Sequence, residues 1–420
     1  MHTSLNSQVK MQLPNILKNI AAGTTSQFGI YLANLATLPY LARVLGTDGL
    51  GQVVYIQSVM ALIMLFVDFG FSWSAIKVIS TSRQDKPTVS RYFFSTWAAQ
   101  WILTILCGAI LIVTSMVTDF IQANNRQLFF GYLIVIGHTL FPFWLLNGLE
   151  KFNASSSIQL ISKIATIPIL FLIVKSHHDI EMAILFFATC NLLGGFLFII
   201  YILKSNTLEW RTPSLSEIIN TYKSSLHTFL ARINVSLCSL LIPIYLNFIS
   251  GPAEVGLYTL ADKVKNLILS LTGPIAAALF PRMSFLAQTE NQKFIKLGLK
   301  AFLWQIAMLI PICFLTWYFA VDIAMLIGGN QFINASTTIR WLSVLPLLTA
   351  TANILGMQIM LPIGMEKTFA KINFLGLIAV ITLGYKYIPT LHADGAAITL
   401  VLTEIFIITM MTYKLRMIKI

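Results

Sequence analysis

Three charged side chains stand within four positions of one apolar stretch, and they are the residues most able to act chemically in this chain. Asp262, Lys263 and Lys265 lie inside a run that extends from about Val255 to Leu279. An ionised Asp or Lys at the centre of a membrane-spanning helix costs about 2.5–3.5 kcal/mol. Three lipid-facing charges would therefore cost roughly 8–10 kcal/mol, comparable to the stability of a domain. We expect them to face a protein-lined, hydrated interior, where ionisable residues mark the paths of ions and polar substrates.

The same residues also permit a structural interpretation. Asp262 and Lys265 are one helical turn apart, so they can pair with each other while Lys263 extends toward the membrane surface. That pairing accounts for two of the charges and leaves the third without a role.

Other polar residues lie deep in other apolar runs. Glu404 sits near the middle of the last run, with no basic residue before Lys414. A carboxylate there must be protonated or paired across helices, and one that changes protonation would suit a proton-coupled carrier. Asp68 lies about 13 Å from the end of its run by helical rise. Arg232 lies at a similar depth and is either an interface anchor or a cavity cation.

The composition places all these residues in a membrane. Hydrophobic residues make up 57% of the 420 residues and charged residues only 10%, against roughly 25% charged in soluble proteins. The net charge of +12 comes mostly from short segments between apolar runs, so a nucleic-acid partner is not expected. The four cysteines each lie alone, with no spacing for a metal or a disulfide framework. The chain is therefore predicted to be an all-α polytopic membrane protein.

Twelve apolar runs are long enough to cross about 30 Å of hydrocarbon. An even number places both termini on one side. Twenty of the 28 basic residues fall on that side and five on the other, so the positive-inside rule predicts cytoplasmic termini. The predicted spans lie near residues 16–42, 50–76, 92–117, 128–149, 158–174, 182–203, 225–249, 254–281, 299–319, 338–363, 369–388 and 395–413.

Two short motifs occur once in each half of the chain. The glycine-rich motif at residues 45–51 returns at residues 249–256, about 205 positions later. The sequence Gly-Leu-Glu-Lys at residues 148–151 returns as Gly-Met-Glu-Lys at residues 364–367. Because six predicted spans separate the members of each pair, the repeats are parallel and related by an axis along the membrane normal.

This repeat predicts two parallel six-helix bundles, residues 1–204 and 224–420, around a central cavity. A cytoplasmic linker, residues 205–223, joins them. Aligning the repeats pairs Gln57 with Asp262, so each bundle places a polar side chain at this depth of its second helix.

The first span and the prolines add further candidates. Gln27 belongs to an unusually hydrophilic first span, whose small and polar residues either pack closely against other helices or line a cavity. Prolines interrupt several spans and could supply bends for moving bundles. The candidate hinges are Pro39, Pro243, Gly273 and Pro274, of which the Gly273-Pro274 pair is the strongest.

The chain shows no catalytic motif. It has no glycine-rich phosphate loop, no GxSxG and no HExxH. No predicted loop is longer than about twenty residues, so no extramembrane domain is available for an enzyme. We expect no enzymatic activity and no cofactor.

Several of these segments resemble one known family. The chain resembles the O-antigen flippases (Wzx type) at residues 38–46 with 49–51, at 254–258 and 261–263, at Gly273-Pro274 and at 279–282. That family is in the polysaccharide-transporter branch of the multidrug/oligosaccharidyl-lipid/polysaccharide (MOP) exporter superfamily, which includes the MATE-like fold.

The resemblance implies a function. Such proteins move undecaprenyl-pyrophosphate-linked oligosaccharides from the cytoplasmic to the periplasmic leaflet of the bacterial inner membrane. Polymerase and chain-length proteins of the same pathway would be partners, and H⁺ or Na⁺ would be the coupling ion. Carried over to this chain, the pyrophosphate-binding role falls on Arg232, Lys263 and Lys265, with Gln57 and Gln27 lining the cavity. The coupling role falls on Asp262, Glu404 and Asp68.

Two other functions stay open at this point. One is a cation-coupled drug exporter of the same superfamily, which buried acids without basic partners would favour. The other is an O-antigen polymerase, a membrane enzyme of similar size, although such enzymes are expected to carry a large periplasmic loop that this chain lacks.

Overall fold

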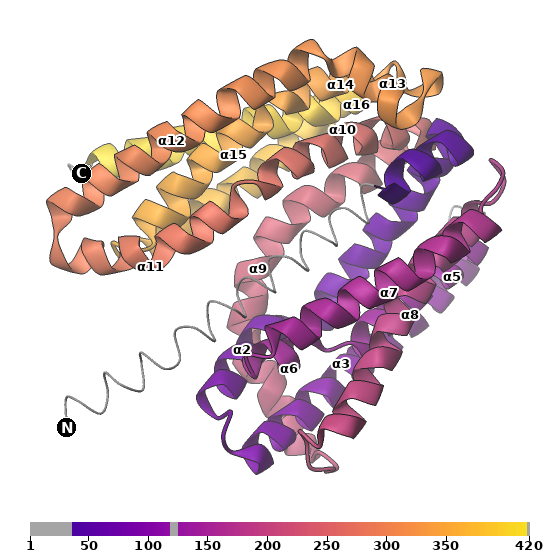
Figure 1. The fold of residues 1–420 in the computed structure, drawn as a ribbon, viewed down its shortest axis with the longest axis vertical. Helices are drawn as coiled ribbons and strands as arrows, with labels where there is room; N and C mark the ends of the chain where they lie inside the picture. Colours follow the sequence, from indigo (N-terminus) through magenta and orange to yellow (C-terminus); the bar gives the residue numbers. More distant parts are fainter. Residues whose placement is uncertain (1–35, 118–124, 418–420) are drawn as a thin grey trace. The chain divides into compact units, whose positions relative to one another are not determined.

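The chain folds as helices joined by short segments (Figure 1). The computed structural model describes residues 36–117 and 125–417, and these residues contain no β-strand. The predicted all-α class is therefore confirmed. Most of the first predicted span, including Gln27, lies outside the described residues.

The helices form two compact units. One comprises Val59–Arg232 with the described part of Met1–Tyr40, and the other comprises Leu41–Ser58 and Ile233–Ile420. The helix Ala36–Asp68 contributes to both. The first unit, with this helix, contains α2 (Phe71–Thr81), α3 (Lys86–Val117), α5 (Asn125–Leu140), α6 (Phe143–Gly148), α7 (Phe152–Ile173), α8 (Ile180–Ser205) and the first part of α9 (Leu215–Ser250). The second contains the rest of α9, then α10 (Pro252–Ser270), α11 (Gly273–Thr289), α12 (Asn291–Tyr318), α13 (Ala320–Gly328), η1 (Asn330–Phe332), α14 (Ala335–Ser343), α15 (Leu345–Asn353), the π-helix η2 (Ile354–Met360) and α16 (Glu366–Met417).

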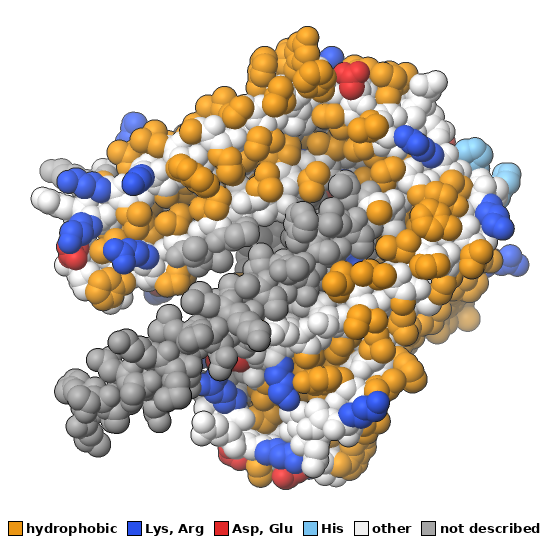
Figure 2. Space-filling model, viewed as in Figure 1, with side chains coloured by type: hydrophobic (Ala, Val, Ile, Leu, Met, Phe, Trp, Pro, Cys, Tyr) orange, Lys and Arg blue, Asp and Glu red, His pale blue; other side chains and the backbone are white. Residues whose placement is uncertain are grey.

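The outer surfaces of these helices are suited to contact with lipid. Eight of the described helices are long and apolar enough to cross a bilayer. Large hydrophobic side chains point outward from them: Ile105 is 68% exposed, Met116 73% and Leu172 69%. Hydrophobic side chains also cover much of the visible surface (Figure 2). Because contiguous apolar surface of this extent is not stable in water, the protein is a multi-pass membrane protein.

The number of crossings does not follow directly from the number of helices. α16 has 52 residues and would be about 78 Å long if straight, which far exceeds the hydrocarbon thickness. Its backbone turns at His392, where φ is 51°, so α16 includes both of the last two predicted spans. Conversely, the predicted span 254–281 is divided between α10 and α11. The count of twelve spans stays a prediction.

The predicted span at residues 50–76 is wrong as a single helix. The helix Ala36–Asp68 ends, Phe69 and Gly70 take positive φ values of 39° and 73°, and α2 begins directly afterwards. A Cβ atom on Gly70 would overlap the backbone of Phe229, so the site requires glycine for both its conformation and its space. Hydropathy did not reveal the break because most of the residues around it are apolar.

In the first unit, small residues let helices approach closely. A Cβ atom on Gly137 of α5 would overlap Asn191 of α8, and one on Gly195 of α8 would overlap Leu140 of α5. Trp144 of α6 is 1% exposed and stacks obliquely on Phe93 of α3, with ring centroids 5.7 Å apart. Close backbone approach and aromatic burial therefore fix the helices without any need for charge.

In the second unit, the sequence repeat produces a reciprocal helix contact. A Cβ atom on Gly51 would overlap the carbonyl of Pro252, and one on Gly256 would overlap the carbonyl of Thr47. Gly51 and Gly256 are equivalent in the repeat, and so are Thr47 and Pro252. The two motifs therefore pack against each other symmetrically, and this contact fixes α10 in position.

Candidate functional site

The charges of α10 lie on two faces of the helix. Lys265 Nζ is 2.5 Å from Asp262 Oδ1, and Asn266 Nδ2 donates to Asp262 Oδ2 at 2.7 Å. The side chain of Lys265 is only 11% exposed and that of Asp262 24%. Lys263 is exposed and, within residues 36–117 and 125–417, forms no ion pair. The structure thus contains the Asp262–Lys265 pair that the i, i+3 spacing permits.

A second carboxylate approaches the same lysine from another helix. Glu404 of α16 lies near enough to Lys265 for electrostatic attraction, and Thr349 of α15 lies beside its carboxyl group. We call Asp262, Lys265, Asn266, Thr349 and Glu404 the acid-rich cluster. It joins three helices of the second unit and contains two carboxylates for one ammonium group.

The charge of this cluster changes the role expected for Lys265. With both carboxylates ionised, the formal charge is −1, and Lys265 is already bonded to Asp262. An anionic substrate would have to compete with that carboxylate at short range. The geometry favours a site that takes up a cation or a proton over one that binds a phosphate.

The remaining predicted site residues are distributed over both units. Gln57 is half-buried in the part of its helix that belongs to the second unit, Leu41–Ser58. Asp68 belongs to the first unit, is 5% exposed and accepts a hydrogen bond from Ser72 Oγ in the first turn of α2. Arg232 lies on α9, at the end of the first unit's range.

The predicted hinges coincide in part with breaks in the helices. α10 ends at Ser270 and α11 begins at Gly273, with Pro274 in its first turn. A Cβ atom on Gly273 would meet nothing within 4 Å. Pro243, by contrast, lies within the continuous helix α9, and Pro39 lies in the helix Ala36–Asp68. Whether these points act as hinges stays a prediction.

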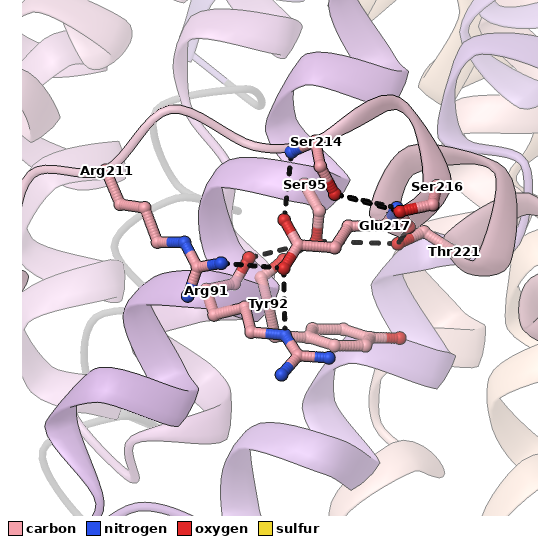
Figure 3. A network of polar contacts seen from close by, with 8 residues as sticks. All are labelled: Arg91, Tyr92, Ser95, Arg211, Ser214, Ser216, Glu217 and Thr221. Atoms are coloured by element: carbon pink, nitrogen blue, oxygen red, sulfur yellow. Dashed lines mark hydrogen bonds and ion pairs between the residues drawn. The ribbon is translucent and has the colours of Figure 1, made fainter.

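Sequence reasoning missed a polar network in the first unit, at the start of α9 (Figure 3). Ser214 and Glu217 form a capping box: the backbone N–H of Ser214 donates to Glu217 Oε2 at 3.0 Å, and that of Glu217 donates to Ser214 Oγ at 3.3 Å. The other carboxylate oxygen, Oε1, lies 3.1 Å from Arg91 Nε and 2.9 Å from Arg211 Nη2. The available signal was the sequence Ser-x-x-Glu at residues 214–217. Arg211 lies three residues before it and Arg91 far upstream, but the positive-inside rule already explained both arginines.

The capping box and the arginines keep Glu217 ionised. The backbone N–H of Ser214, and then the positive charges of Arg211 and Arg91, hold the pKa of this carboxyl below its ordinary value of 4.5. Its side chain is 14% exposed, whereas those of Arg91 and Arg211 are 60% and 49% exposed. We call these three residues the arginine-rich network, which contains two cations for one anion.

A pocket of about 360 Å³ adjoins this network between α3 and α9. Besides Arg91 and Glu217, its lining includes the hydroxyl groups of Thr88 and Ser224 and the amide of Asn220. The structure thus contains two charged sites of opposite balance, one in each unit.

Comparison with known sequences identifies the family. The family described as "Polysaccharide biosynthesis protein" matches residues 16–287, which is more than half of the chain. The chain is 27% identical over 405 residues to a protein of Escherichia coli K12 named "Putative O-antigen transporter", covering 96% of this chain and 97% of that one. A protein of the same name from Shigella dysenteriae is 25% identical over 389 residues, covering 91% and 95%.

Comparison with solved structures identifies the fold. An inward-facing multidrug resistance MATE family transporter of the MOP superfamily superposes with a TM-score of 0.71 at 15% identity, covering 92% of this chain and 95% of that one. The lipid II flippase MurJ, in an inward closed conformation, gives the same TM-score at 14% identity, covering 94% and 87%. The resemblance drawn from the sequence is confirmed: the chain has the fold of the MOP superfamily and belongs to the polysaccharide biosynthesis protein family.

Proposed function

We propose that this protein is a flippase for lipid-linked O-antigen repeat units. In this proposal it moves an undecaprenyl-pyrophosphate-linked oligosaccharide from the cytoplasmic to the periplasmic leaflet of a bacterial inner membrane by alternating access. Both termini are cytoplasmic, and polymerase and chain-length proteins of the same pathway would act on the product.

The observation that carries the proposal is the end-to-end similarity to two proteins named as O-antigen transporters. In both comparisons the similarity covers more than nine-tenths of this chain and of the relative. Between the described helices, no connecting segment exceeds the nine residues 206–214. The chain is therefore suited to transport within the bilayer and not to catalysis in a separate domain.

In this proposal, the substrate is bound by basic residues that lie outside the acid-rich cluster. A pyrophosphate needs cationic partners in a site poor in water, while its polyprenyl tail can remain in lipid. Lys263 is exposed and so can reach a ligand, whereas Lys265 is bonded to Asp262. Lys263, Arg232 and Gln57 are our candidates for contact with the substrate.

Ion coupling in this proposal falls on the acid-rich cluster. With Asp262 and Glu404 both ionised, the site has a formal charge of −1, and one H⁺ or Na⁺ would neutralise it. Neutralising a charge in surroundings of low dielectric constant strongly changes the stability of the helix packing around it. Because α10, α15 and α16 all contribute, uptake of an ion would alter how three helices pack.

A drug exporter of the same superfamily is the second candidate. The fold does not separate the two functions, since the MATE transporter and the MurJ flippase superpose equally well. The Asp262–Lys265 pair argues against the exporter, because an acid with a basic partner departs from the pattern expected there. Drug uptake by everted vesicles would support the exporter over the flippase.

The direct test is a deletion strain. Deleting the gene should cause lipid-linked repeat units to accumulate on the cytoplasmic face of the inner membrane, and a plasmid copy should clear them. A deletion strain with no such accumulation would contradict the proposal.

A further inference from the structure

The arginine-rich network leaves unused hydrogen-bond donors beside an open pocket. Arg91 contacts Glu217 through Nε alone, so its two Nη groups face outward. Within the described part of the chain, they form no other ion pair. A guanidinium fork of this kind matches two oxygens of one phosphate group, which is a geometry that lysine lacks.

The network also fixes the orientation of both arginines before any ligand arrives. The capping box holds Glu217 Oε2, and Arg91 and Arg211 converge on Oε1 from two different directions (Figure 3). Preorganised donors lose less conformational entropy on binding. The formal charge of the network is +1, so an anion would be attracted and the carboxylate would not exclude it.

The pocket has the right size for a small headgroup, and its lining is mixed polar and apolar. Its volume is about 360 Å³, and hydroxyl and amide groups of Thr88, Ser95, Asn220 and Ser224 line it. The Nδ2 group of Asn220 can donate to a phosphate or glycerol oxygen, whereas the hydroxyls of Thr88, Ser95 and Ser224 already donate to Asp85 and to backbone carbonyls and can act as acceptors.

Two nearby features place the pocket at the level of the membrane surface. It lies at the start of α3, whose membrane-crossing part extends over Lys86–Met116. Trp210 is 83% exposed and contacts Phe94 of α3 edge-on, with ring centroids 5.1 Å apart. Exposed tryptophans beside basic residues are typical of the interface between hydrocarbon and headgroups.

We propose that this pocket binds the phosphate of an anionic lipid headgroup, with Arg91 and Arg211 as its cationic contacts. The site is separate from the acid-rich cluster and does not depend on which substrate the protein transports. Bound lipid would connect α3 to the start of α9 and to the segment 206–214 that leads into it.

The test uses the full-length chain in detergent, with lipid binding followed by native mass spectrometry. The probes are dioleoylphosphatidylglycerol, dioleoylphosphatidylcholine and inorganic phosphate. We expect phosphatidylglycerol to bind the wild type at least about tenfold more tightly than it binds the Arg91→Gln/Arg211→Gln variant. A matched control, Lys77→Gln/Lys204→Gln, removes two exposed charges of the same unit outside the pocket and should bind as the wild type does.

A second variant separates loss of the site from loss of the fold. Asn220→Trp fills the pocket while it keeps both arginines, and it should also lose tight binding of phosphatidylglycerol. Equal binding by the wild type, the double arginine variant and Asn220→Trp would overturn the proposal. Tight binding of inorganic phosphate that phosphatidylglycerol cannot displace would also overturn it, by assigning the pocket to a soluble phosphate.

Discussion

The arginine-rich network and the acid-rich cluster have opposite composition. The arginine-rich network of the first unit sets two half-exposed guanidinium groups around one carboxylate. The acid-rich cluster of the second unit sets two carboxylates around one ammonium group that is 11% exposed. The first therefore has a surplus of positive charge near water, and the second has more carboxyl groups than cations in a drier place.

This difference indicates different ligands and different sensitivity to mutation. A surplus of cations at a membrane surface suits phosphate, whereas a buried surplus of carboxylate suits a proton or a metal cation. Exposed ion pairs add little stability, but a buried charge that loses its partner is strongly destabilising. Mutations in the acid-rich cluster should therefore have larger effects than those in the arginine-rich network.

The largest effect is expected from Lys265→Ala. This change leaves Asp262 and Glu404 without their shared cation and should lower the free energy of unfolding by about 3–5 kcal/mol, as removal of one partner from a buried pair does. Thermal unfolding of the purified protein, together with its yield in membranes, measures the loss.

Lys263→Ala is the matched control for that variant. Lys263 is exposed and forms no ion pair among the described residues, so its removal should leave stability within about 0.5 kcal/mol of the wild type. Translocation should still fall, because Lys263 is a proposed contact of the pyrophosphate. Equal stability of Lys265→Ala and Lys263→Ala would show that the cluster does not depend on its shared lysine.

An intermediate effect is expected from Gly256→Ala, which acts on the support of the acid-rich cluster. The added methyl group would overlap the carbonyl of Thr47 and displace α10, which carries Asp262 and Lys265. Overpacking of this kind costs about 1–3 kcal/mol. Gly273→Ala is the control, since a Cβ atom there meets nothing within 4 Å. If the two variants unfold at the same temperature, the reciprocal glycine contact has no role in positioning α10.

The smallest effect is expected from Glu217→Gln in the arginine-rich network. This change should lower the free energy of unfolding by about 1 kcal/mol or less, because both arginines are largely exposed. The pKa of Glu217 is lowered on folding, so its contribution to stability is present above the ordinary pKa of a glutamate and is lost as the pH falls through the folded value. The wild type should therefore lose more stability than Glu217→Gln when the pH is lowered from 7 into the acid range. Parallel pH curves for the two proteins would contradict this assignment.

Much of the fold could be predicted because it follows from local pattern. The i, i+3 spacing of Asp262 and Lys265 permits only a few arrangements, and pairing is one that the sequence already indicated. The Gly-Pro sequence at Gly273 predicted a break that the structure places between α10 and α11. The equivalence of Gly51 and Gly256 was visible in the sequence, although their mutual contact was not, since a repeat does not say which copies touch.

What could not be predicted depends on contacts between distant segments. Arg91 and Glu217 lie on different helices, and the basic residues of these segments were already explained by the positive-inside rule. Glu404 was predicted to be either protonated or paired across helices, and only the fold shows that Thr349 and Lys265 lie near it. The break at Gly70 depends on the backbone of Phe229, which no window around residue 70 contains.

Translocation by the purified protein tests the central claim most directly. The chain would be reconstituted into liposomes that carry an undecaprenyl-pyrophosphate-linked repeat unit, and the fraction of repeat units that crosses the bilayer would be followed with and without a gradient of H⁺ or Na⁺. We predict that the wild type moves the lipid faster with one of these gradients and that Glu404→Gln loses this acceleration. A wild-type rate equal to that of protein-free liposomes, under every gradient, would contradict the account.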